Sequence, residues 1–582
     1  MLEDVLKYFN RIYLNNIKII NIILNILSAE RNQMENTEKP KKIKKESFIQ
    51  GIMAIMFSQV IIKLLGLVYK VYLTNREGFG DEGNALYSAG FQIYALLLTL
   101  SSIGVPSAVS KLVSERLALG DAKGAHRIFK IAFVTFAFIG LAGTLMLFFG
   151  ANIIATKWIG MPEAELTLVA LSPSVFFVTI ASVIRGYFNG RKRLGVAANS
   201  QTLEQIFKTL LTIIIVEVVA MLSIGNTELM AAGANFATTL ATILGFGYLY
   251  MYYRSKRKEV WKDIQTSTGN KSERVKTIVK QILWVAIPIS LSSLLSAVNK
   301  NIDTFTVVNG LKTFMGAEEA RIQYGILSGK VDTLTSLPLS FNIAFAVALV
   351  PAIASAFALG DRKSAEKKVS FSMLLTVLIG LPCTIGMCVF AEQILHLLYP
   401  MAPDGSMVLA ISAFTIIFTA LAQTINGALQ GIGKVAVPAI ALGTGVVVKL
   451  ILNLILVPIP NIGVNGAAIG SVVCHLVSFI IGFAVIKKYI KIDFKFNKCI
   501  FKPILATIMM TICSYFVYMS LNTIISERMA TLIALIVAVI IYGLSIIVLR
   551  IFEKEEIFML PYGEKIYNLL KKMKIYKEPK TQ

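Results

Sequence analysis

Residues 48–116 read FIQGIMAIMFSQVIIKLLGLVYKVYLTNREGFGDEGNALYSAGFQIYALLLTLSSIGVPSAVSKLVSER, and this stretch decides the fold. Two apolar segments, each long enough to cross a bilayer as a helix, flank a short glycine-rich loop. The first segment carries Lys63 and Lys70 inside an otherwise apolar run. An ammonium group at the bilayer centre costs roughly 2.5–3.5 kcal/mol on insertion scales, so such groups face a bundle interior or a water-filled cavity.

Lys63 and Lys70 share one helix face. They are seven residues apart, which is nearly two helical turns, and Gly66 lies beside them. We expect this face to line a wet cavity. A second interpretation stays open here, because long lysine side chains can snorkel to the membrane surface. Snorkelling suits Lys70, near the helix end, better than Lys63.

The composition indicates an integral membrane protein. Hydrophobic residues make up 55% of the 582 residues, charged residues make up 16%, and the mean hydropathy is +0.69. The five cysteines form no CxxC pair and the three histidines are scattered, so the sequence predicts neither a disulfide framework nor a metal site. No P-loop, GxSxG elbow or other catalytic constellation is visible, and we expect no enzyme.

Apolar stretches of about 20 residues predict an all-α integral membrane protein with fourteen transmembrane helices. The expected spans are 48–73, 85–109, 128–150, 164–184, 196–222, 230–253, 281–308, 325–350, 370–391, 406–429, 435–457, 464–486, 503–522 and 530–549.

Charge orients these spans. With residue 1 in the cytoplasm, the inner loops and tails hold 45 Lys and Arg residues and the outer loops hold five. The positive-inside rule therefore predicts a multi-pass protein of the cell membrane with both termini cytoplasmic. The net charge of +23 is explained by this topology and by anionic membrane lipids as partners, without nucleic acid.

The chain resembles itself at an offset of about 240 residues. LALGDAKGAHR at 117–127 matches FALGDRKSAEK at 357–367, and further along Gly186 aligns with Gly427 and Lys208 with Lys449. Spans 1–6 thus repeat as spans 7–12. Because six is even, both copies insert with the same orientation, as a parallel repeat. We expect two six-helix lobes around a central cavity, plus two extra C-terminal helices.

The predicted parts of the chain follow from these patterns. They are a basic cytoplasmic tail (1–46), an N-lobe (47–255), a basic cytoplasmic linker (256–280), a C-lobe (281–488), spans 13 and 14 (489–552) and a cytoplasmic C-terminal tail (553–582).

Charged residues inside the spans are the candidates for function. Lys300 and Asp303 are three apart on span 7 and can pair on one face, whereas Lys330 and Asp332 on span 8 are two apart and point to different faces. The alternative role for Lys300 and Asp303 is a lobe-locking ion pair. We assign to the substrate cavity Lys63, Lys70, Lys300 and Asp303.

Three carboxylates are candidates for coupling or gating: Asp332, Glu204 and Glu217. Glu204 and Glu217 can pair with Lys208 or meet a coupling cation. Lys208 and Lys449 lie near the predicted inner ends of their spans, and we expect them to reach lipid headgroups.

The net positive charge of the predicted cavity lining favours an anionic substrate. The first spans of both lobes present three lysines and one aspartate. A drug-cation exporter would need the reverse, isolated carboxylates in the cavity. Lysine ammonium groups are compact point charges that suit phosphate. A diphosphate headgroup, with its lipid tail left in the bilayer, fits a wet cationic groove between two lobes.

The residues quoted above resemble a known family. KLLGLVYKVYL, then GNALYSAGFQIYALLLTLSSIGVPSAVSKLVSERLALGD, then NKNIDTFTV are similar to the polysaccharide-biosynthesis branch of the multidrug/oligosaccharidyl-lipid/polysaccharide (MOP) exporter superfamily, over nearly all of residues 47–550. This branch includes sporulation proteins and lipid II flippases. Its functional cations lie on the first two spans of each lobe, and the resemblance maps these substrate-cavity cations onto Lys63, Lys70, Lys111, Lys300 and Lys330. They are often arginines on span 1, where this chain has lysines, and lysine lacks the bidentate geometry of arginine.

The resemblance implies a flippase that moves undecaprenyl-diphosphate-linked saccharides from the inner to the outer leaflet by alternating access. The expected substrate is the peptidoglycan precursor lipid II, and the expected unit is a monomer without cofactor, coupled to Na+, H+ or the membrane potential. The alternatives are an exporter of another lipid-linked oligosaccharide, such as a teichoic-type one, and a multidrug cation antiporter. A membrane glycosyltransferase would need a carboxylate or histidine in a large outer loop, and 309–324 offers only Glu318 and Glu319.

Overall fold

A computed structural model of the chain describes residues 48–553, except 103, 224, 268–272, 359, 435 and 491–496, together with 556, 557 and 567. The N-terminal tail, the middle of the basic linker and nearly all of the C-terminal tail lie outside the described residues. The described residues from 54 onward form one compact unit. The predicted domain boundaries stay a prediction.

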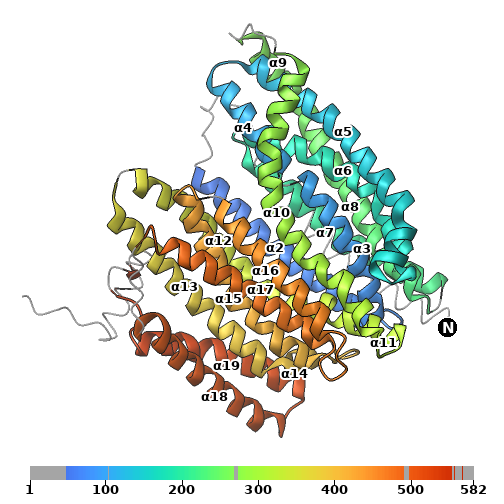
Figure 1. Cartoon of the computed structure of the whole chain (residues 1–582), viewed down its shortest axis with the longest axis vertical. Coiled ribbons are helices and arrows are strands. Elements are labelled where there is room, and N and C mark those ends of the chain that lie inside the picture. The colour runs from blue at the N-terminus through green and yellow to red at the C-terminus, as the bar shows by residue number, and fades with distance from the viewer. Residues whose placement is uncertain are drawn as a thin grey trace, which may run out of the picture. The chain divides into compact units, whose positions relative to one another are not determined.

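The first half of the unit is all helical (Figure 1). Its elements are α2 (Phe48–Asn75), α3 (Gly80–Ser102), α4 (Gly104–Ala118), α5 (Ala122–Ile153), η1 (Ile154–Ile159), η2 (Pro162–Ala164), α6 (Glu165–Gly190), α7 (Leu194–Leu222), α8 (Thr227–Ser255) and α9 (Arg257–Gln265).

The second half is also helical. Its elements are α10 (Val275–Leu311), α11 (Ala317–Gly325), η3 (Ile326–Val331), α12 (Asp332–Ala358), α13 (Arg362–Val389), α14 (Ala391–Leu398), α15 (Ser406–Gly431), α16 (Ala436–Leu456), α17 (Val464–Ile486), η4 (Asn497–Phe501), α18 (Lys502–Asn522) and α19 (Glu527–Val548).

The helices agree with the predicted spans. Eleven helical segments of the described chain are long and apolar enough to cross a membrane. The other three expected spans are occupied by α2, α10 and α12, with 28, 37 and 27 residues. The structure is therefore all-α and consistent with fourteen spans. The expected second span falls within the apolar helical segment Gly80–Ala118.

The two halves pack their helices in the same order. In the first half α5 packs on α6, α6 on α8, and α7 on α8; in the second half α13 packs on α15, α15 on α17, and α16 on α17. The sequence repeat aligns these same pairs. Close approach in the first half depends on Gly186, because a Cβ there would lie 2.8 Å from the backbone of Pro106 on α4. The halves meet where α10 and α11 pack against α3.

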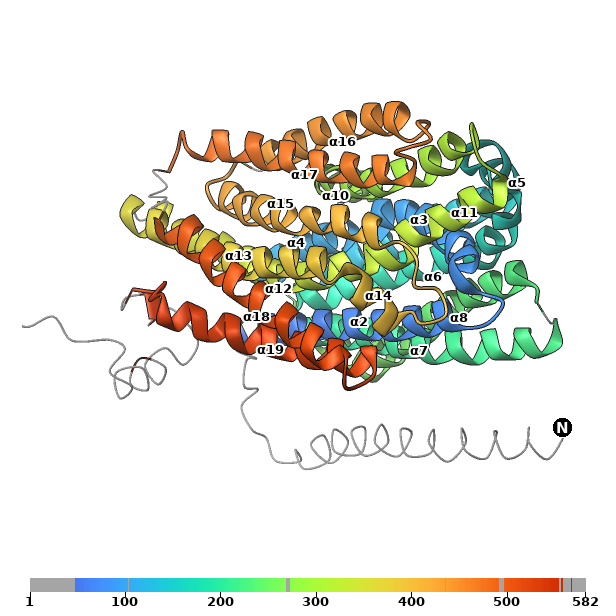
Figure 2. The ribbon, with the colours of Figure 1, turned by 90° about the horizontal axis from the view of Figure 1, so that it is seen from below.

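The outer surface of the unit is apolar, as lipid contact requires. Large hydrophobic side chains such as Phe149 on α5 and Val539 on α19 are about three-quarters exposed. The added helices α18 and α19 pack against each other and against α13 and α14, as Figures 1 and 2 show. Phe390 makes edge-on contacts with Tyr515 and Tyr518 at this junction.

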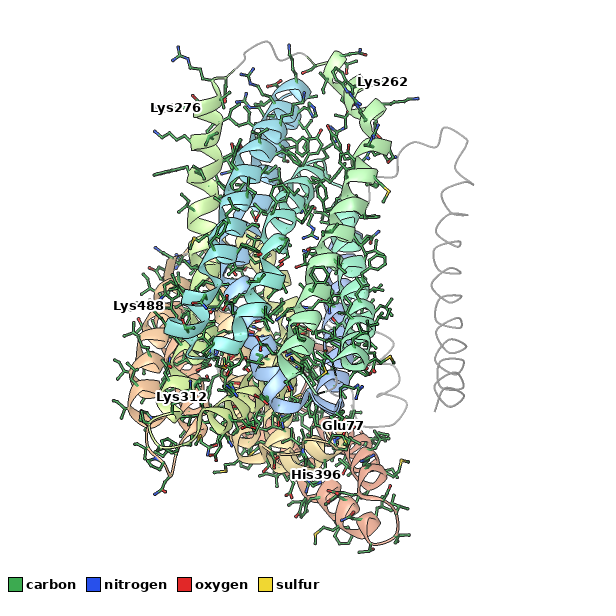
Figure 3. All side chains as sticks on the ribbon, turned by 90° about the vertical axis from the view of Figure 1, so that its right-hand side faces the viewer. Glu77, Lys262, Lys276, Lys312, His396 and Lys488 are labelled. Atoms are coloured by element: carbon green, nitrogen blue, oxygen red, sulfur yellow. The ribbon has the colours of Figure 1, made fainter. Side chains whose placement is uncertain are left out.

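Loops that the charge count assigns to opposite sides of the membrane lie at opposite ends of the helices. In Figure 3, Glu77 and Lys312 lie toward one end, and Lys262 and Lys276 lie toward the other. The first two residues belong to loops that the charge count assigns to the outside, and the last two belong to the basic linker segment. The direction of α10, which runs from Lys276 to the loop with Lys312, therefore agrees with the predicted sides of its flanking loops.

This alternation predicts the labelling of single cysteines. In a version of the protein without its five native cysteines, Glu77→Cys should react with a membrane-impermeant maleimide added to intact cells. Lys258→Cys should react only after permeabilisation, since both positions are exposed and only their side of the membrane differs. Labelling of both cysteines from the same side would contradict the fourteen-span topology.

Candidate functional site

A cavity lies between the two halves of the unit, and we call it the central cavity. Helices α2 and α3 line one side, and α10, η3 and α12 line the other. Its volume is about 170 Å³. Its polar lining residues in the described chain are Lys63, Lys70, Tyr69, Tyr87, Ser88, Gln92, Lys300, Ser328, Asp332, Thr333 and Ser336.

Three of the predicted cations meet in the central cavity. Lys63 and Lys70 come from α2, as their spacing predicts, and Lys300 comes from α10 on the opposite side. Their charges outnumber that of Asp332, the described carboxylate of this lining, by three to one. The cavity therefore carries an excess of positive charge, in a setting where low dielectric strengthens attraction for an anion.

The three lysines differ in how they are held. Lys70 is 8% exposed, donates a hydrogen bond to Ser88 Oγ at 3.3 Å, and places Nζ 4.3 Å from the centre of the Tyr87 ring. Lys63 is half-buried and Lys300 is exposed. Lys63 lies within electrostatic reach of both Lys300 and Asp332. Lys63 and Lys300, which are less buried, can thus reorient toward a ligand, while Lys70 is held in the wall of the central cavity.

Lys330 is not part of this lining, contrary to the prediction. It is 0% exposed and forms an ion pair with Asp81 of α3 at 2.8 Å. The same ammonium donates hydrogen bonds to the carbonyl oxygens of Ala402 at 2.8 Å and Asp404 at 2.7 Å. Lys330 sits in the π-helical turn η3, which turns its side chain into the contact between the halves.

Further polar contacts join the halves at the same end, and we call this set the latch. Arg321 of α11 forms ion pairs with Glu163 at 2.6 Å and Glu82 at 3.0 Å. Asn75 donates to Leu398 O at 2.7 Å and accepts from Met401 N at 3.2 Å. The remaining member is the Lys330–Asp81 pair described above.

Glycine permits the close crossing beneath the latch. A Cβ at Gly325 would lie 1.8 Å from the carbonyl oxygen of Asp81, and one at Gly329 would lie 2.7 Å from the Asn84 side chain. Backbones this close leave no room for a side chain. The latch end of the central cavity is therefore sealed by direct contact between α3 and the α11–η3 segment.

The expected Lys300–Asp303 pair is replaced by a pair between two helices. Asp303 Oδ2 lies 2.6 Å from Lys449 Nζ on α16, and Asp303 Oδ1 accepts a hydrogen bond from Asn453 at 2.9 Å. Lys449 also donates to Asn299 O at 2.9 Å and is 2% exposed. The expectation that Lys449 reaches lipid headgroups is wrong, because its ammonium is enclosed by α10 and α16.

The remaining candidates are held elsewhere. Lys111 is exposed on α4, 3.9 Å from Glu115, and Glu217 contacts Arg76 at 3.0 Å and the Tyr72 hydroxyl. Glu204 pairs with Arg185 at 2.7 Å. Lys208, also expected at the headgroups, is instead buried.

Sequence reasoning missed Asp81, Arg321 and Lys449 as structural partners. One signal was present, since the repeat aligned Lys208 with Lys449 inside apolar helices. Two equivalent deep lysines indicate a position facing the interior of each half.

Among the described residues no group of three or more His, Cys, Asp or Glu side chains could hold a metal ion. The carboxylate of Asp303 is occupied on both oxygens by Lys449 and Asn453. Asp332 is the described carboxylate that faces the central cavity.

Comparisons with known proteins agree with this architecture. A family model described as "Polysaccharide biosynthesis protein" matches residues 48–357, and the MatE model matches residues 329–455. The chain is 25% identical over 524 residues to stage V sporulation protein B of Bacillus subtilis (strain 168), covering 89% of this chain and 98% of that protein. It is also 25% identical over 462 residues to the lipid II flippase MurJ of the same organism, covering 77% and 84%.

A solved structure shares the fold. The structure titled "Lipid II flippase MurJ, inward closed conformation" has a TM-score of 0.62 at 17% sequence identity, and the match covers 85% of this chain and 98% of that chain. At this identity the likeness shows the fold alone.

The buried Asp303–Lys449 pair predicts a stability effect. Lys449→Met removes the ammonium and leaves the Asp303 carboxylate buried without its cation, which costs roughly 3–5 kcal/mol in comparable buried pairs. We expect a clearly lower melting temperature of the purified protein. The double variant Lys449→Met with Asp303→Asn should recover part of the loss, because no uncompensated charge remains.

The exposed Lys157→Met serves as the control, since Lys157 lies on the surface of η1. An unchanged melting temperature for Lys449→Met would show that the pair does not stabilise the second half.

Proposed function

We propose a function from the family of this chain, which belongs to the polysaccharide biosynthesis protein family of the MOP exporter superfamily. The chain flips lipid-linked saccharides across the cell membrane. The substrate is held by its diphosphate and moves from the inner to the outer leaflet. We assign it the undecaprenyl-diphosphate-linked peptidoglycan precursor, lipid II. A relative that supports this assignment is the lipid II flippase described above.

The observation that carries the proposal is the meeting of Lys63, Lys70 and Lys300 from both halves around one cavity. A diphosphate bears several negative oxygens, and each ammonium offers three donors to such a group. The hydroxyl of Ser88, which accepts a hydrogen bond from Lys70, adds a further donor. Asp332 offsets part of the positive charge when no substrate is bound, so it competes with the diphosphate and aids its release.

The latch supplies the conformational step. It closes the end of the central cavity that carries the loops assigned to the outside by charge. The structure then represents an inward-directed state, and delivery to the outer leaflet requires that the latch contacts separate while the halves rock. Transport by one unit of this kind needs no partner subunit, and both termini stay cytoplasmic.

Energy coupling belongs to the same proposal. Na+, H+ and the membrane potential are each compatible with a cavity that holds three lysines and one aspartate. Asp332 is the group that an entering cation would meet in the described lining.

A multidrug cation antiporter is the second candidate. The MatE match over residues 329–455 favours it. The excess of lysines in the central cavity opposes it, because a drug cation would be repelled there. An exporter of a teichoic-type or other lipid-linked oligosaccharide uses the same diphosphate chemistry and differs in the sugar carried.

Lys63→Ala tests the cavity directly. Loss of a charge-assisted contact worth about 1.5–3 kcal/mol should weaken diphosphate binding roughly 10- to 100-fold. The variant should fail to restore growth to cells depleted of their own lipid II flippase, at unchanged protein level in the membrane. Lys63→Arg keeps the charge and should retain much of the activity.

Lys111→Ala is the matched control, since this lysine lies on the exposed surface of α4. Normal growth with Lys63→Ala at normal expression would contradict the assignment of this lysine to the substrate.

A cross-link across the latch tests the conformational step. In a cysteine-less background, Asn75→Cys and Met401→Cys place two thiols where Asn75 now bonds the Met401 backbone. Oxidation should join them, hold the latch closed and stop complementation or transport, and a reductant should restore it. Full transport by the oxidised protein would show that the latch need not open.

A further inference from the structure

A second cavity lies within the first half of the unit, and we call it the N-lobe cavity. It is formed by α2, α3, α4, α6, α7 and α8 and has a volume of about 510 Å³. Phe91 lines both this cavity and the central cavity. The Phe91 ring stacks on that of Tyr87, which lines the central cavity, with centroids 5.9 Å apart.

Lys208 projects into the N-lobe cavity from α7. Its side chain is more than nine-tenths buried, with an exposed fraction of 6%. Nζ lies 4.1 Å from the centre of the Phe91 ring and 5.3 Å from that of Tyr69. A ring face offers no hydrogen-bond acceptor, and among the described residues no acceptor lies within hydrogen-bond distance of the Lys208 ammonium.

No carboxylate of the described residues neutralises Lys208. Glu204, one helical turn earlier on the same helix, is the natural partner at this spacing. Its carboxylate instead bonds Arg185 of α6 at 2.7 Å, and that guanidinium is also fixed by Ser200 at 2.9 Å. Helix α2, part of whose side chains lie outside the described residues, has no acidic residue in its sequence. The charged groups of the lining therefore sum to one net positive charge.

A buried ammonium without a counter-charge is unfavourable, and it attracts an anion into any space beside it. The cavity offers that space. Gln201 and Gln205 line it on the helix that carries Lys208, and each amide can donate two hydrogen bonds. Ile62, Leu98 and Val178 form an apolar portion of the same wall. The lining thus combines one cation and neutral donors with a surface suited to a hydrocarbon chain.

We propose that the N-lobe cavity binds a phosphate group at Lys208, supplied by free phosphate or by the headgroup of an anionic phospholipid. The site differs from the central cavity in its lining, since Lys208 lines the N-lobe cavity and Lys70 lines the central one. This proposal goes beyond the flippase function and does not depend on it.

The test measures binding rather than transport. Purified full-length protein is heated in increasing inorganic phosphate, with chloride at equal ionic strength as the comparison. In parallel, native mass spectrometry counts phosphatidylglycerol and phosphatidylcholine molecules retained by the protein. We expect either stabilisation by phosphate and not by chloride, or retention of one phosphatidylglycerol in preference to phosphatidylcholine. The first result identifies free phosphate as the ligand and the second identifies a lipid headgroup.

Lys208→Gln should raise the phosphate concentration needed for stabilisation at least tenfold, or abolish the retained phosphatidylglycerol. Lys208→Arg and the surface variant Lys157→Gln should behave like the wild type. Equal binding by Lys208→Gln and wild type would overturn the proposal, as would equal stabilisation by chloride with no preference between the lipids. If Lys208→Gln yields no folded protein, Gln205→Leu takes its place and must weaken the same binding; unchanged binding would overturn the proposal.

Discussion

The cost of a cation in a medium of low dielectric is the constraint on which this structure depends. Each deep lysine must find a carboxylate, a set of carbonyls, an aromatic face or water. Lys330 and Lys449 find carboxylates and carbonyls and become structural, as their exposed fractions of 0% and 2% show. Lys63 and Lys300 have no ion pair among the described residues and face the central cavity. The unpaired lysines, rather than all lysines, indicate where an anionic substrate can be held.

The latch and the central cavity are linked because neighbouring residues of the same segments belong to one or to the other. Both include residues of α3 on one side and of η3 on the other. Ser328 and Asp332 face the cavity, while Lys330 between them points into the latch. A movement that separates Lys330 from Asp81 therefore also moves residues of the cavity wall. The geometry couples opening of one end to a change in the shape of the substrate site.

The sequence predicted the helical membrane fold, the matched packing order of the two halves and the convergence of Lys63, Lys70 and Lys300. These follow from apolar length, an internal repeat and helical spacing, which are local properties. It failed for Lys330 and Asp303, because spacing along one helix cannot show a partner on another helix. The expectation that Lys208 and Lys449 reach lipid headgroups failed for a related reason. Their positions in apolar helices do not show whether the side chains point to the membrane surface or to the protein interior. The assignment of site residues to a substrate stays a prediction.

The equivalent lysines of the two halves, Lys208 and Lys449, have different partners. Lys449 is neutralised by Asp303 of α10, whereas α2, the corresponding helix of the first half, has no acidic residue. In its place Lys208 faces the aromatic rings of Tyr69 and Phe91. The repeat thus preserves the backbone arrangement while the charge balance of the halves diverges. This difference leaves the first half with more uncompensated positive charge, beside the cavity assigned to the diphosphate.

The central claim is that the cavity between the halves accepts a lipid diphosphate rather than a cation. Reconstitution of the purified chain in liposomes, with a fluorescent polyprenyl-diphosphate saccharide or a fluorescent cationic drug, measures this directly through quenching by a membrane-impermeant reagent. The account predicts protein-dependent movement of the diphosphate lipid that the combined Lys63→Ala and Lys300→Ala substitutions abolish. Movement of the cationic drug, with the diphosphate lipid left in its original leaflet, would contradict it.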